Sequence, residues 1–251
     1  MKLRSRRSRT LVAAVAVLLP GRLRRAAHTR LLGYRLHPAA VIGRAFVDVG
    51  ELEMDEHARI GGLTVLRGCR LVRMGPEATI GSLNLITGVR AESTAFETPG
   101  RDPSLVMERG SLITYMHVLD LSDRLTLEEF GIIAGFLSLV QTHAMNTETL
   151  RQSSSPVVVR RYGMVTSRCV LLPGADVPEA SIVAAGGVVT GALKDASRCT
   201  VLPDGPSWAS RLAKQSSVPS ASASHQEFAP SAVVNPGPTR TTQKPGVVKL
   251  A

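Results

Sequence analysis

Aromatic side chains are scarce in this sequence, which has five Phe, three Tyr and one Trp among 251 residues although 44% of the residues are apolar. A core must therefore consist mostly of aliphatic side chains. The three cysteines, at positions 69, 169 and 199, include no close pair. This spacing argues against a disulfide framework or a four-cysteine zinc site and favours a reducing compartment, the cytoplasm.

Acidic residues are missing from residues 1–47, which contain eleven Lys or Arg. The remaining 19 basic and 20 acidic residues nearly cancel, so the net charge of +10 divides into +11 near the N-terminus and −1 elsewhere. A nucleic-acid-binding domain would carry positive charge on its folded body. We therefore expect no nucleic-acid partner, but an anionic surface close to the N-terminus.

The longest early apolar run, residues 11–19, has nine residues and is too short to span a bilayer. Basic residues precede it as in a secretory signal, but Arg22, Arg24 and Arg25 follow at once and no cleavage site ends it. We expect residues 1–32 to form a basic and apolar helical segment. Two interpretations stay open, in which the helix either lies on the anionic inner face of a membrane or packs on the domain.

The C-terminal residues 215–251 contain five Pro, six Ser and four charged side chains, without a sustained apolar period. Such a composition cannot bury enough surface to become ordered, so this segment is predicted to be a disordered tail. Residues 196–214 are expected to close the domain that precedes it.

A six-residue period runs through the chain between these ends. Aliphatic residues occupy every sixth position from 159 to 189, namely Val159, Val165, Leu171, Val177, Val183 and Val189. Small residues stand four positions after the first five of them, namely Gly163, Cys169, Ala175, Ser181 and Gly187. Two independent patterns in one register favour a structural repeat over chance.

The same register recurs upstream with interruptions. Its members are Met54, Ile60 and Leu66, then Met74, Ile80 and Ile86, then Val106, Leu112 and Val118, then Leu127, Ile133 and Leu139. A period of six suits short parallel strands joined by tight bends, three of which close a triangular coil of about 18 residues. Successive coils stack about 4.8 Å apart with their aliphatic side chains inside.

This pattern resembles the hexapeptide-repeat acyltransferases over roughly residues 33–211, within which residues 33–195 correspond to the repeat domain. The most specific part is the stretch 162–190, which includes a Leu-Pro-Gly turn at Leu172 and the sequence Ala184-Ala-Gly-Gly-Val-Val189. Ala58-Arg-Ile-Gly-Gly and Ala78-Thr-Ile-Gly-Ser fit the same repeat. The layout is most similar to maltose and exopolysaccharide O-acetyltransferases. The resemblance implies an all-β fold, a left-handed parallel β-helix that is an exception to right-handed crossovers.

Two segments interrupt the repeat, at about 91–105 and 145–156, and must leave the solenoid at its corners. His143 stands just before the second one, in a Thr-His pair like that which carries the general base of the resembled family. It also lies four residues after Leu139, at a corner position that regular repeats give to a small residue. A corner histidine that only bonds to a neighbouring coil is the alternative.

The resemblance implies further site residues. His117 and Asp120 could bind the acceptor or support the base, and Asn146 stands where the family often has an acid. Acetyl-CoA is the implied acyl donor, held by Ser167, Ala185 and Thr190, with Arg211 near its phosphates. Similar enzymes form trimers with sites between neighbouring chains, so a homotrimer is also implied.

The implied function is transfer of an acetyl group from CoA to a sugar or glycan hydroxyl. A metal-dependent hydratase on the same fold, as in γ-type carbonic anhydrases, would need three histidine ligands, and only His117 and His143 stand where ligands would be needed, so no metal is expected. A non-catalytic β-helix that acts as a scaffold or binding module stays open, because the fold alone does not establish chemistry.

Overall fold

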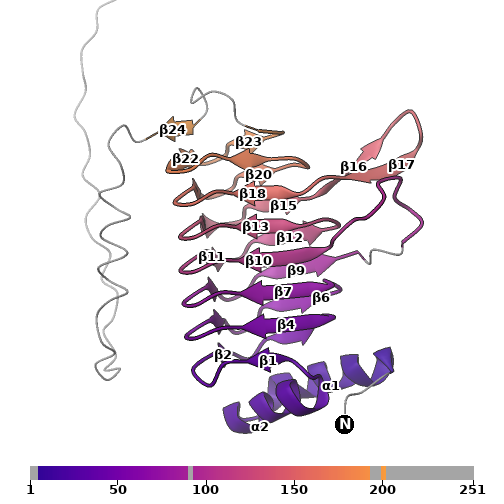
Figure 1. Ribbon diagram of the computed structural model, residues 1–251, viewed down its shortest axis with the longest axis vertical. Helices are drawn as coiled ribbons and strands as arrows, with labels where there is room; N and C mark the ends of the chain where they lie inside the picture. Colours follow the sequence, from indigo (N-terminus) through magenta and orange to yellow (C-terminus); the bar gives the residue numbers. More distant parts are fainter. Residues whose placement is uncertain (1–4, 90–92, 193–198, 202–251) are drawn as a thin grey trace, which may run out of the picture.

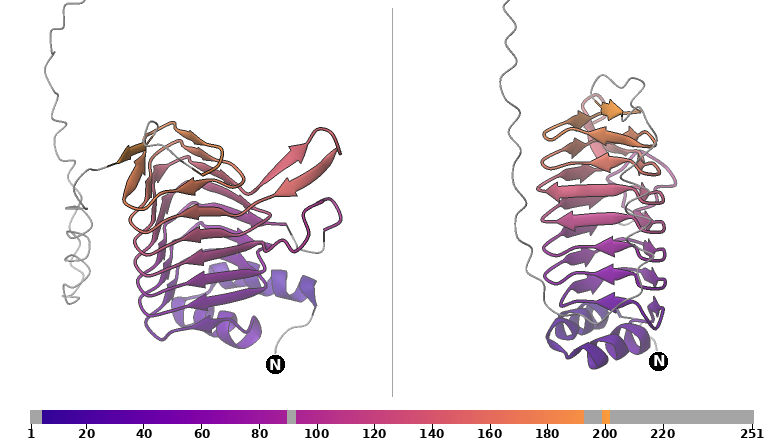
Figure 2. Two further views of the ribbon diagram at one scale, coloured as in Figure 1. Left: turned by 45° about the horizontal axis from the view of Figure 1, so that its top comes forward. Right: turned by 90° about the vertical axis from the view of Figure 1, so that its left-hand side faces the viewer.

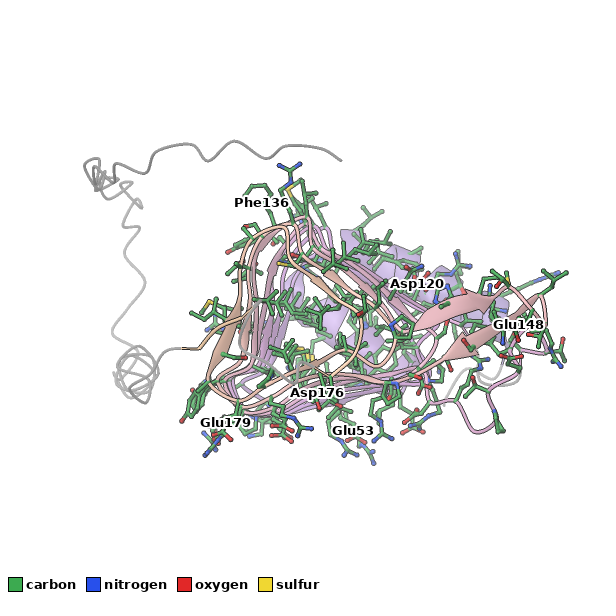
Figure 3. The ribbon with its side chains drawn as sticks, turned by 90° about the horizontal axis from the view of Figure 1, so that it is seen from above. Glu53, Asp120, Phe136, Glu148, Asp176 and Glu179 are labelled. Carbon is green, nitrogen blue, oxygen red and sulfur yellow. The ribbon has the colours of Figure 1, made fainter. Side chains whose placement is uncertain are left out.

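The computed structural model describes residues 5–89, 93–192 and 199–201, and most of them form a left-handed parallel β-helix (Figure 1). The chain passes through three parallel sheets in turn and completes seven coils, which stack into a three-sided prism (Figure 3). The predicted all-β fold is confirmed. The predicted C-terminal tail, residues 215–251, and most of the closing segment lie outside the described residues.

Three sheets, which we name A, B and C, form the faces of the prism. Sheet A contains β1 (Arg35–Leu36), β4 (Glu51–Met54), β7 (Leu71–Met74), β10 (Ser104–Met107), β13 (Leu125–Leu127), β18 (Val157–Val159) and β21 (Asp176–Val177). Sheet B contains β2 (Val41–Ile42), β5 (Arg59–Ile60), β8 (Thr79–Ile80), β11 (Leu112–Tyr115), β14 (Ile132–Phe136), β19 (Met164–Val165), β22 (Ser181–Val183) and the antiparallel β24 (Cys199–Val201). Sheet C contains β3 (Phe46–Asp48), β6 (Val65–Arg67), β9 (Leu85–Gly88), β12 (Val118–Leu121), β15 (Leu139–Gln141), β20 (Val170–Leu171) and β23 (Val188–Val189).

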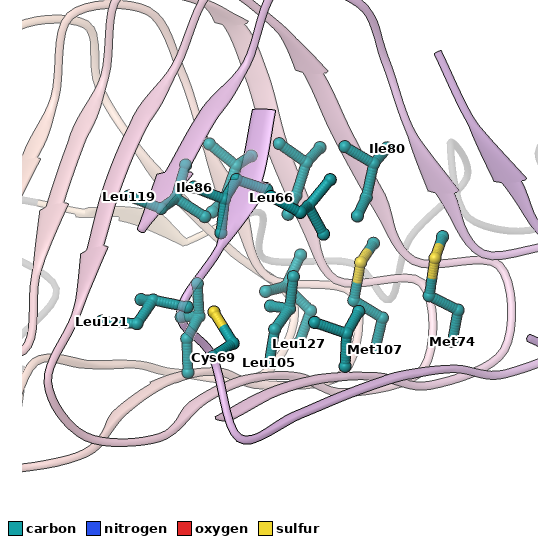
Figure 4. Close-up of a cluster of buried hydrophobic side chains, with 14 of the residues drawn as sticks. Leu66, Cys69, Met74, Ile80, Ile86, Leu105, Met107, Leu119, Leu121 and Leu127 are labelled. Atoms are coloured by element: carbon teal, nitrogen blue, oxygen red, sulfur yellow. The ribbon is translucent and has the colours of Figure 1, made fainter. Parts of the chain in front are cut away.

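The core consists of aliphatic side chains stacked directly above one another. Met54 aligns with Met74, Ile60 with Ile80, and Leu66 with Ile86, and all six side chains are buried. Figure 4 shows several of these side chains in rows along the prism. The six aliphatic residues predicted between positions 159 and 189 are buried as well. Neighbouring coils thus bury each other's apolar side chains, which a single coil could not bury by itself.

The predicted register is wrong in the fourth coil. Val106, Leu112 and Val118 are not buried, and the inward side chains are those of Leu105, Met107, Ile113 and Leu119. The first interruption of the repeat ends immediately before this coil, and the pairing of β10 with β7 sets the phase anew, with Met107 opposite Met74. One residue of shift turns every side chain of a strand to the other face.

The register is also wrong at the end of the fifth coil, where Val140 is buried in place of Leu139. The cause is one extra residue in β14: Ile113 aligns with Ile133, whereas Tyr115 aligns with Phe136. This β-bulge contains Gly135, whose φ of +70° suits a glycine. His143 is therefore three residues after an inward side chain and not four, so it does not occupy the small-residue corner expected for it.

Helices close the N-terminal end of the prism (Figure 2). They are α1 (Arg6–Leu18), α2 (Gly21–Ala26) and a π-helix (Ala27–Leu31). Ala13 and Ala16 of α1 are fully buried. Arg24 and Arg25 donate hydrogen bonds to backbone carbonyl groups of residues 36–42. The segment thus packs on the domain, the second of the two interpretations, and no helix among the described residues has the length and apolar character needed to cross a membrane.

Candidate active site

Both interruptions of the repeat leave the prism at the edge between sheets C and A, which we call the C–A edge. The first is the loop between β9 and β10, of which the structure describes residues 89 and 93–103. The second is a hairpin of β16 (His143–Asn146) and β17 (Arg151–Ser154), which lies between β15 and β18. Figure 2 shows both projecting from the same side of the prism. The site predicted near the second interruption therefore has walls from two separate segments.

The loop and the hairpin are bonded to each other. Glu97 and Ala95 of the loop form backbone hydrogen bonds with Gln152 of β17, at 2.8 and 3.1 Å. The Thr98 hydroxyl accepts a hydrogen bond from the backbone N–H of Ser154 at 2.9 Å, and Arg151 donates to two carbonyl groups of the loop. This pairing holds two long insertions in one arrangement.

His143 is the first residue of the hairpin, and its side chain is half-buried. Its Nδ1 atom lies 3.3 Å from the Oγ atom of Ser122, which follows β12 in the coil below. The ring also contacts Phe96 of the loop edge-on, with centroids 6.1 Å apart. Within the described part of the chain, no group bonds to Nε2. With the proton on Nδ1 donated to Ser122, the Nε2 lone pair is free to accept a proton.

The base of the hairpin is fixed by the buried side chains of Thr142 and Asp123. The Thr142 hydroxyl accepts hydrogen bonds from the backbone N–H groups of Ser122 and Asp123, at 2.7 and 2.8 Å. The Asp123 carboxylate accepts one from the hydroxyl of Ser154, which is paired with His143 across the hairpin. Buried groups with satisfied partners have little freedom to move, so the position of His143 is determined by the coil beneath it.

A buried arginine supports the loop from below. Arg101 is 5% exposed, and its guanidinium carbon lies 3.6 Å from the centre of the Phe96 ring. It also donates to the backbone carbonyl of Ser122 at 2.9 Å. A cation over an aromatic face is stabilising when both are removed from water. Arg101 thus connects Ser122, which bonds to His143, with Phe96, which packs beside His143.

His117 does not lie at the C–A edge. It is fully buried at the edge between sheets B and C, the B–C edge, four residues after the inward Ile113. Its Nδ1 accepts a hydrogen bond from the backbone N–H of Ser138, and its Nε2 lies 2.9 Å from the Thr114 hydroxyl. Burial lowers the pKa of His117 to about 4. Its corner position is filled by Thr64 and Asn84 in lower coils, so His117 here holds adjacent coils together.

Asp120 and Asn146 lie at the C–A edge with His143. Asp120 is on the outer face of β12 (Figure 3), between Thr87 and Gln141, and its backbone carbonyl accepts from the N–H of Thr142. Asn146 donates from Nδ2 to Glu97 of the loop at 3.1 Å. Hydrogen bonds from Thr149 and Asn146 lower the pKa of Glu97. Asn146 therefore joins the hairpin to the loop.

The residues expected to bind CoA occupy two different edges. Ser167 and Ala185 lie at the B–C edge in adjacent coils, where the N–H of Gly186 donates to the carbonyl of Ser167. Thr190 directly follows β23 and lies at the C–A edge, two coils beyond His143. Arg211 is outside the described residues. One chain alone does not bring Ser167 and Ala185 to His143.

Comparisons with known proteins give little beyond this. No family model and no curated protein matches the sequence. Among solved structures, the chain is similar to a UDP-N-acetylglucosamine acyltransferase from Campylobacter jejuni, with 14% identity over 60% of this chain and 71% of that chain, at a TM-score of 0.22. The strands and their register establish the parallel β-helix independently of this likeness.

The described residues contain no group of three or more His, Cys, Asp or Glu side chains that could hold a metal ion. Cys69 and Cys169 are buried and unpaired with one another, and burial raises the pKa of Cys69 to about 12. A thiol with so high a pKa is a poor nucleophile near neutral pH.

Ser122, Phe96 and Arg101 are the site residues that the sequence did not point to. Each contacts His143 or its immediate support, but each comes from another coil or from the first interruption. The sequence carries no direct signal for them, because their approach to His143 depends on the register of the coils between the two interruptions.

Proposed function

We propose that this protein is an acyltransferase that moves an acetyl or similar acyl group from CoA to a hydroxyl of a sugar or glycan precursor, with His143 as the general base. The observation that carries the proposal is the state of the His143 ring. Its Nδ1 is held by Ser122, its ring makes an edge-on contact with Phe96, and its Nε2 has no partner among the described residues. An imidazole with one nitrogen held and the other open in this way suits removal of a proton from a hydroxyl.

In the proposed reaction, Nε2 of His143 removes the proton of the acceptor hydroxyl as its oxygen attacks the thioester carbonyl carbon. The carbon–sulfur bond then breaks, and the imidazolium returns the proton to the departing thiolate, so the enzyme ends as it began. The contact with Ser122 holds the ring in the orientation that this step requires. Asp120, on the outer face of the coil below, is suited to accept a hydrogen bond from another acceptor hydroxyl.

The B–C edge is suited to the thin arm of CoA. Ser167, Ala184, Ala185 and Gly186 form a strip of small residues there, of which the last three are exposed. Arg168 is exposed at the same corner and provides a cation for a phosphate. Large side chains would block this strip, so its composition supports CoA binding at this edge.

A second copy of the chain would complete the site, because the strip and His143 lie on different edges. An apolar band supports such an assembly: exposed Leu63, Leu83, Met116 and Leu137 occupy the B–C edge in four successive coils. Tyr115 and Phe136 extend the band and are 57% and 50% exposed. Exposed apolar patches of this kind mark protein contacts. We propose a homotrimer in which the B–C edge of each copy faces the C–A edge of the next.

The outer face of α1 supports a location at the cytoplasmic side of a membrane. Leu11, Val15 and Leu18 are exposed on one side of this helix, between Arg7 and Arg22. Aliphatic side chains flanked by arginines suit the surface of an anionic bilayer. We propose peripheral contact through this face, while the buried alanines of α1 hold the helix on the prism.

The test is a donor and acceptor screen with the full chain, in which acetyl-CoA is mixed with sugars and release of free thiol is measured together with the mass of the product. We expect turnover that falls by a factor of about 10² to 10⁴ in His143→Asn. The matched control is His57→Asn, because the His57 side chain is exposed at the edge between sheets A and B and contacts none of the site residues.

Calorimetry separates catalysis from binding. We expect the wild type to release heat on binding CoA. We expect His143→Asn to bind CoA with similar heat although its turnover is lost. Absence of CoA binding would contradict the acyltransferase and favour a scaffold. Equal turnover in the two variants would contradict the role of His143.

A further inference from the structure

A basic cavity of about 910 Å³ lies near the N-terminal end of the prism, far from the strip proposed for CoA. Its walls are the first turns of α1, the C–A edge of the first three coils, and Val89, Ser93 and Pro103 of the loop between β9 and β10. Figure 1 shows that α1 extends beneath the side from which the loop projects. Three segments distant in sequence therefore surround this space.

Positive charge dominates the cavity wall. Arg6, Arg9, Arg67 and Arg70 line it, and Asp48 is its one acidic residue among those described. The Asp48 carboxylate accepts a hydrogen bond from the Thr10 hydroxyl at 2.7 Å. Within the described residues, neither Arg6 nor Arg67 forms an ion pair, although Arg67 is aligned with Asp48 in sheet C. The cavity thus holds uncompensated cations, which attract an anion.

Two of the arginines are held firmly. Arg9 donates to the carbonyl oxygens of Leu32 and Val49, both at 3.0 Å. Arg70 is bonded to Asp102 through both Nε and Nη2, and the same carboxylate also binds Arg124. Arg9 therefore keeps its charge beside the cavity at little cost in side-chain entropy when a ligand binds, whereas the charge of Arg70 is offset by Asp102.

The start of α1 adds to this field. The helix has 13 residues, and its first turn contains no acidic side chain to offset the positive end of the dipole. Arg6, the first helical residue, lines the cavity itself. The dipole and the guanidinium groups act in the same direction.

We propose that this cavity binds a phosphate or diphosphate group, with Arg67 and Arg6 as the residues that contact it. Tetrahedral oxyanions accept several charge-assisted hydrogen bonds at once, which is what a guanidinium group offers. The site is separate from the proposed acyl transfer and does not depend on it. Its ligand is either a soluble phosphate ester or the headgroup of a phospholipid. A headgroup is included because α1 lines the cavity and also has the exposed apolar face.

In the first test, the full chain is titrated with pyrophosphate at low ionic strength and the heat of binding is measured by calorimetry. In a parallel test, the chain is sedimented with vesicles of phosphatidylglycerol. We expect binding that is about tenfold weaker in Arg67→Gln. The matched control is Arg59→Gln, because Arg59 is an exposed strand arginine on sheet B and forms no ion pair with any described residue. Thermal unfolding of each variant verifies that it is folded.

Two outcomes support the site and distinguish its ligand. Arg67-dependent binding of pyrophosphate identifies a soluble phosphate ester, and Arg67-dependent binding of vesicles without pyrophosphate binding identifies a headgroup. Binding of neither probe overturns the proposal, as does equal loss in the two variants. Failure of this test leaves the CoA titration unaffected, because the cavity and the strip occupy different coils.

Discussion

The Nδ1 atom of His143 lies 3.3 Å from the Oγ atom of Ser122, although 21 residues separate them in the chain. The stacking of β15 on β12 brings them together, because the two corners after these strands lie directly above one another. The hydroxyl that orients the proposed base thus comes from the coil beneath it and not from the hairpin that carries the base.

Replacing Ser122 with alanine tests this relationship. We expect kcat to fall about tenfold with KM nearly unchanged, because the ring loses its orienting partner while the acceptor contacts remain. Steady-state kinetics of the Ser122→Ala variant measure both constants. Ser181→Ala is the control, since its hydroxyl bonds to the Pro178 carbonyl at another edge. A larger KM with unchanged kcat would show that Ser122 contacts the substrate instead.

The stability of the fold should depend on pH through two buried histidines. Burial lowers the pKa of His117 to about 4, and burial together with the charge of Arg24 lowers that of His28 to about 4. Between pH 4 and 6.5 the unfolded chain binds more protons at these sites than the folded chain. The free energy of unfolding therefore decreases as the pH falls through this window.

Thermal unfolding measured between pH 7 and 5 checks this expectation. This pH range lies above the range in which most carboxylates titrate. We expect the midpoint temperature to fall with pH, and to fall less steeply in His117→Asn. The exposed His57 supplies the control variant His57→Asn, whose slope should match the wild type. Identical slopes in all three proteins would show that His117 is not neutral in the folded state.

The proposed trimer depends on the apolar band at the B–C edge. Phe136→Asp combined with Leu137→Asp puts two charges into this band, and we expect the assembly to dissociate into monomers because buried charges lack partners. Light scattering coupled to size-exclusion chromatography gives the mass. Leu18→Asp, at a leucine that is 82% exposed on α1, should remain trimeric. A monomeric wild type would contradict the assembly.

The proposed membrane contact depends on the outer face of α1. We expect Leu11→Ser combined with Leu18→Ser to bind phosphatidylglycerol vesicles at least about tenfold more weakly, because each leucine contributes through apolar burial. Sedimentation with vesicles measures this. Leu150→Ser on the hairpin is a control at a similarly exposed leucine. Equal binding to neutral phosphatidylcholine vesicles would contradict the role of the arginines.

The repeat was predictable between Val159 and Val189, where every sixth residue is aliphatic and a small residue follows four positions after most of them. It was not predictable at Leu139 and Val140, because both are aliphatic and only the bulge at Gly135 decides which of them is buried. The corner argument applied to His143 in fact describes His117, four residues after the inward Ile113. A period states how often a side chain turns inward, but an inserted residue changes the phase without changing the period.

The candidate site was predictable only in part for a related reason. His143 was identified through its Thr-His pair. In the structure the two residues differ in role, because Thr142 is buried and fixes the base of the hairpin, whereas His143 is the proposed base. Ser122, Phe96 and Arg101 come from other segments, and their nearness depends on which edge each insertion leaves. That requires the register of every intervening coil, which a single sequence does not determine.

The arginines of the N-terminal helices have a consequence for self-association. A stack of strands has two open ends, and the exposed carbonyl groups of the coil at either end can pair with a strand of another chain. Arg24, Arg25 and Arg9 donate to carbonyl groups of residues 36–50 at this end. Guanidinium groups thereby occupy the acceptors that an incoming strand would need, so this end of the solenoid is blocked against end-to-end polymerisation into fibres.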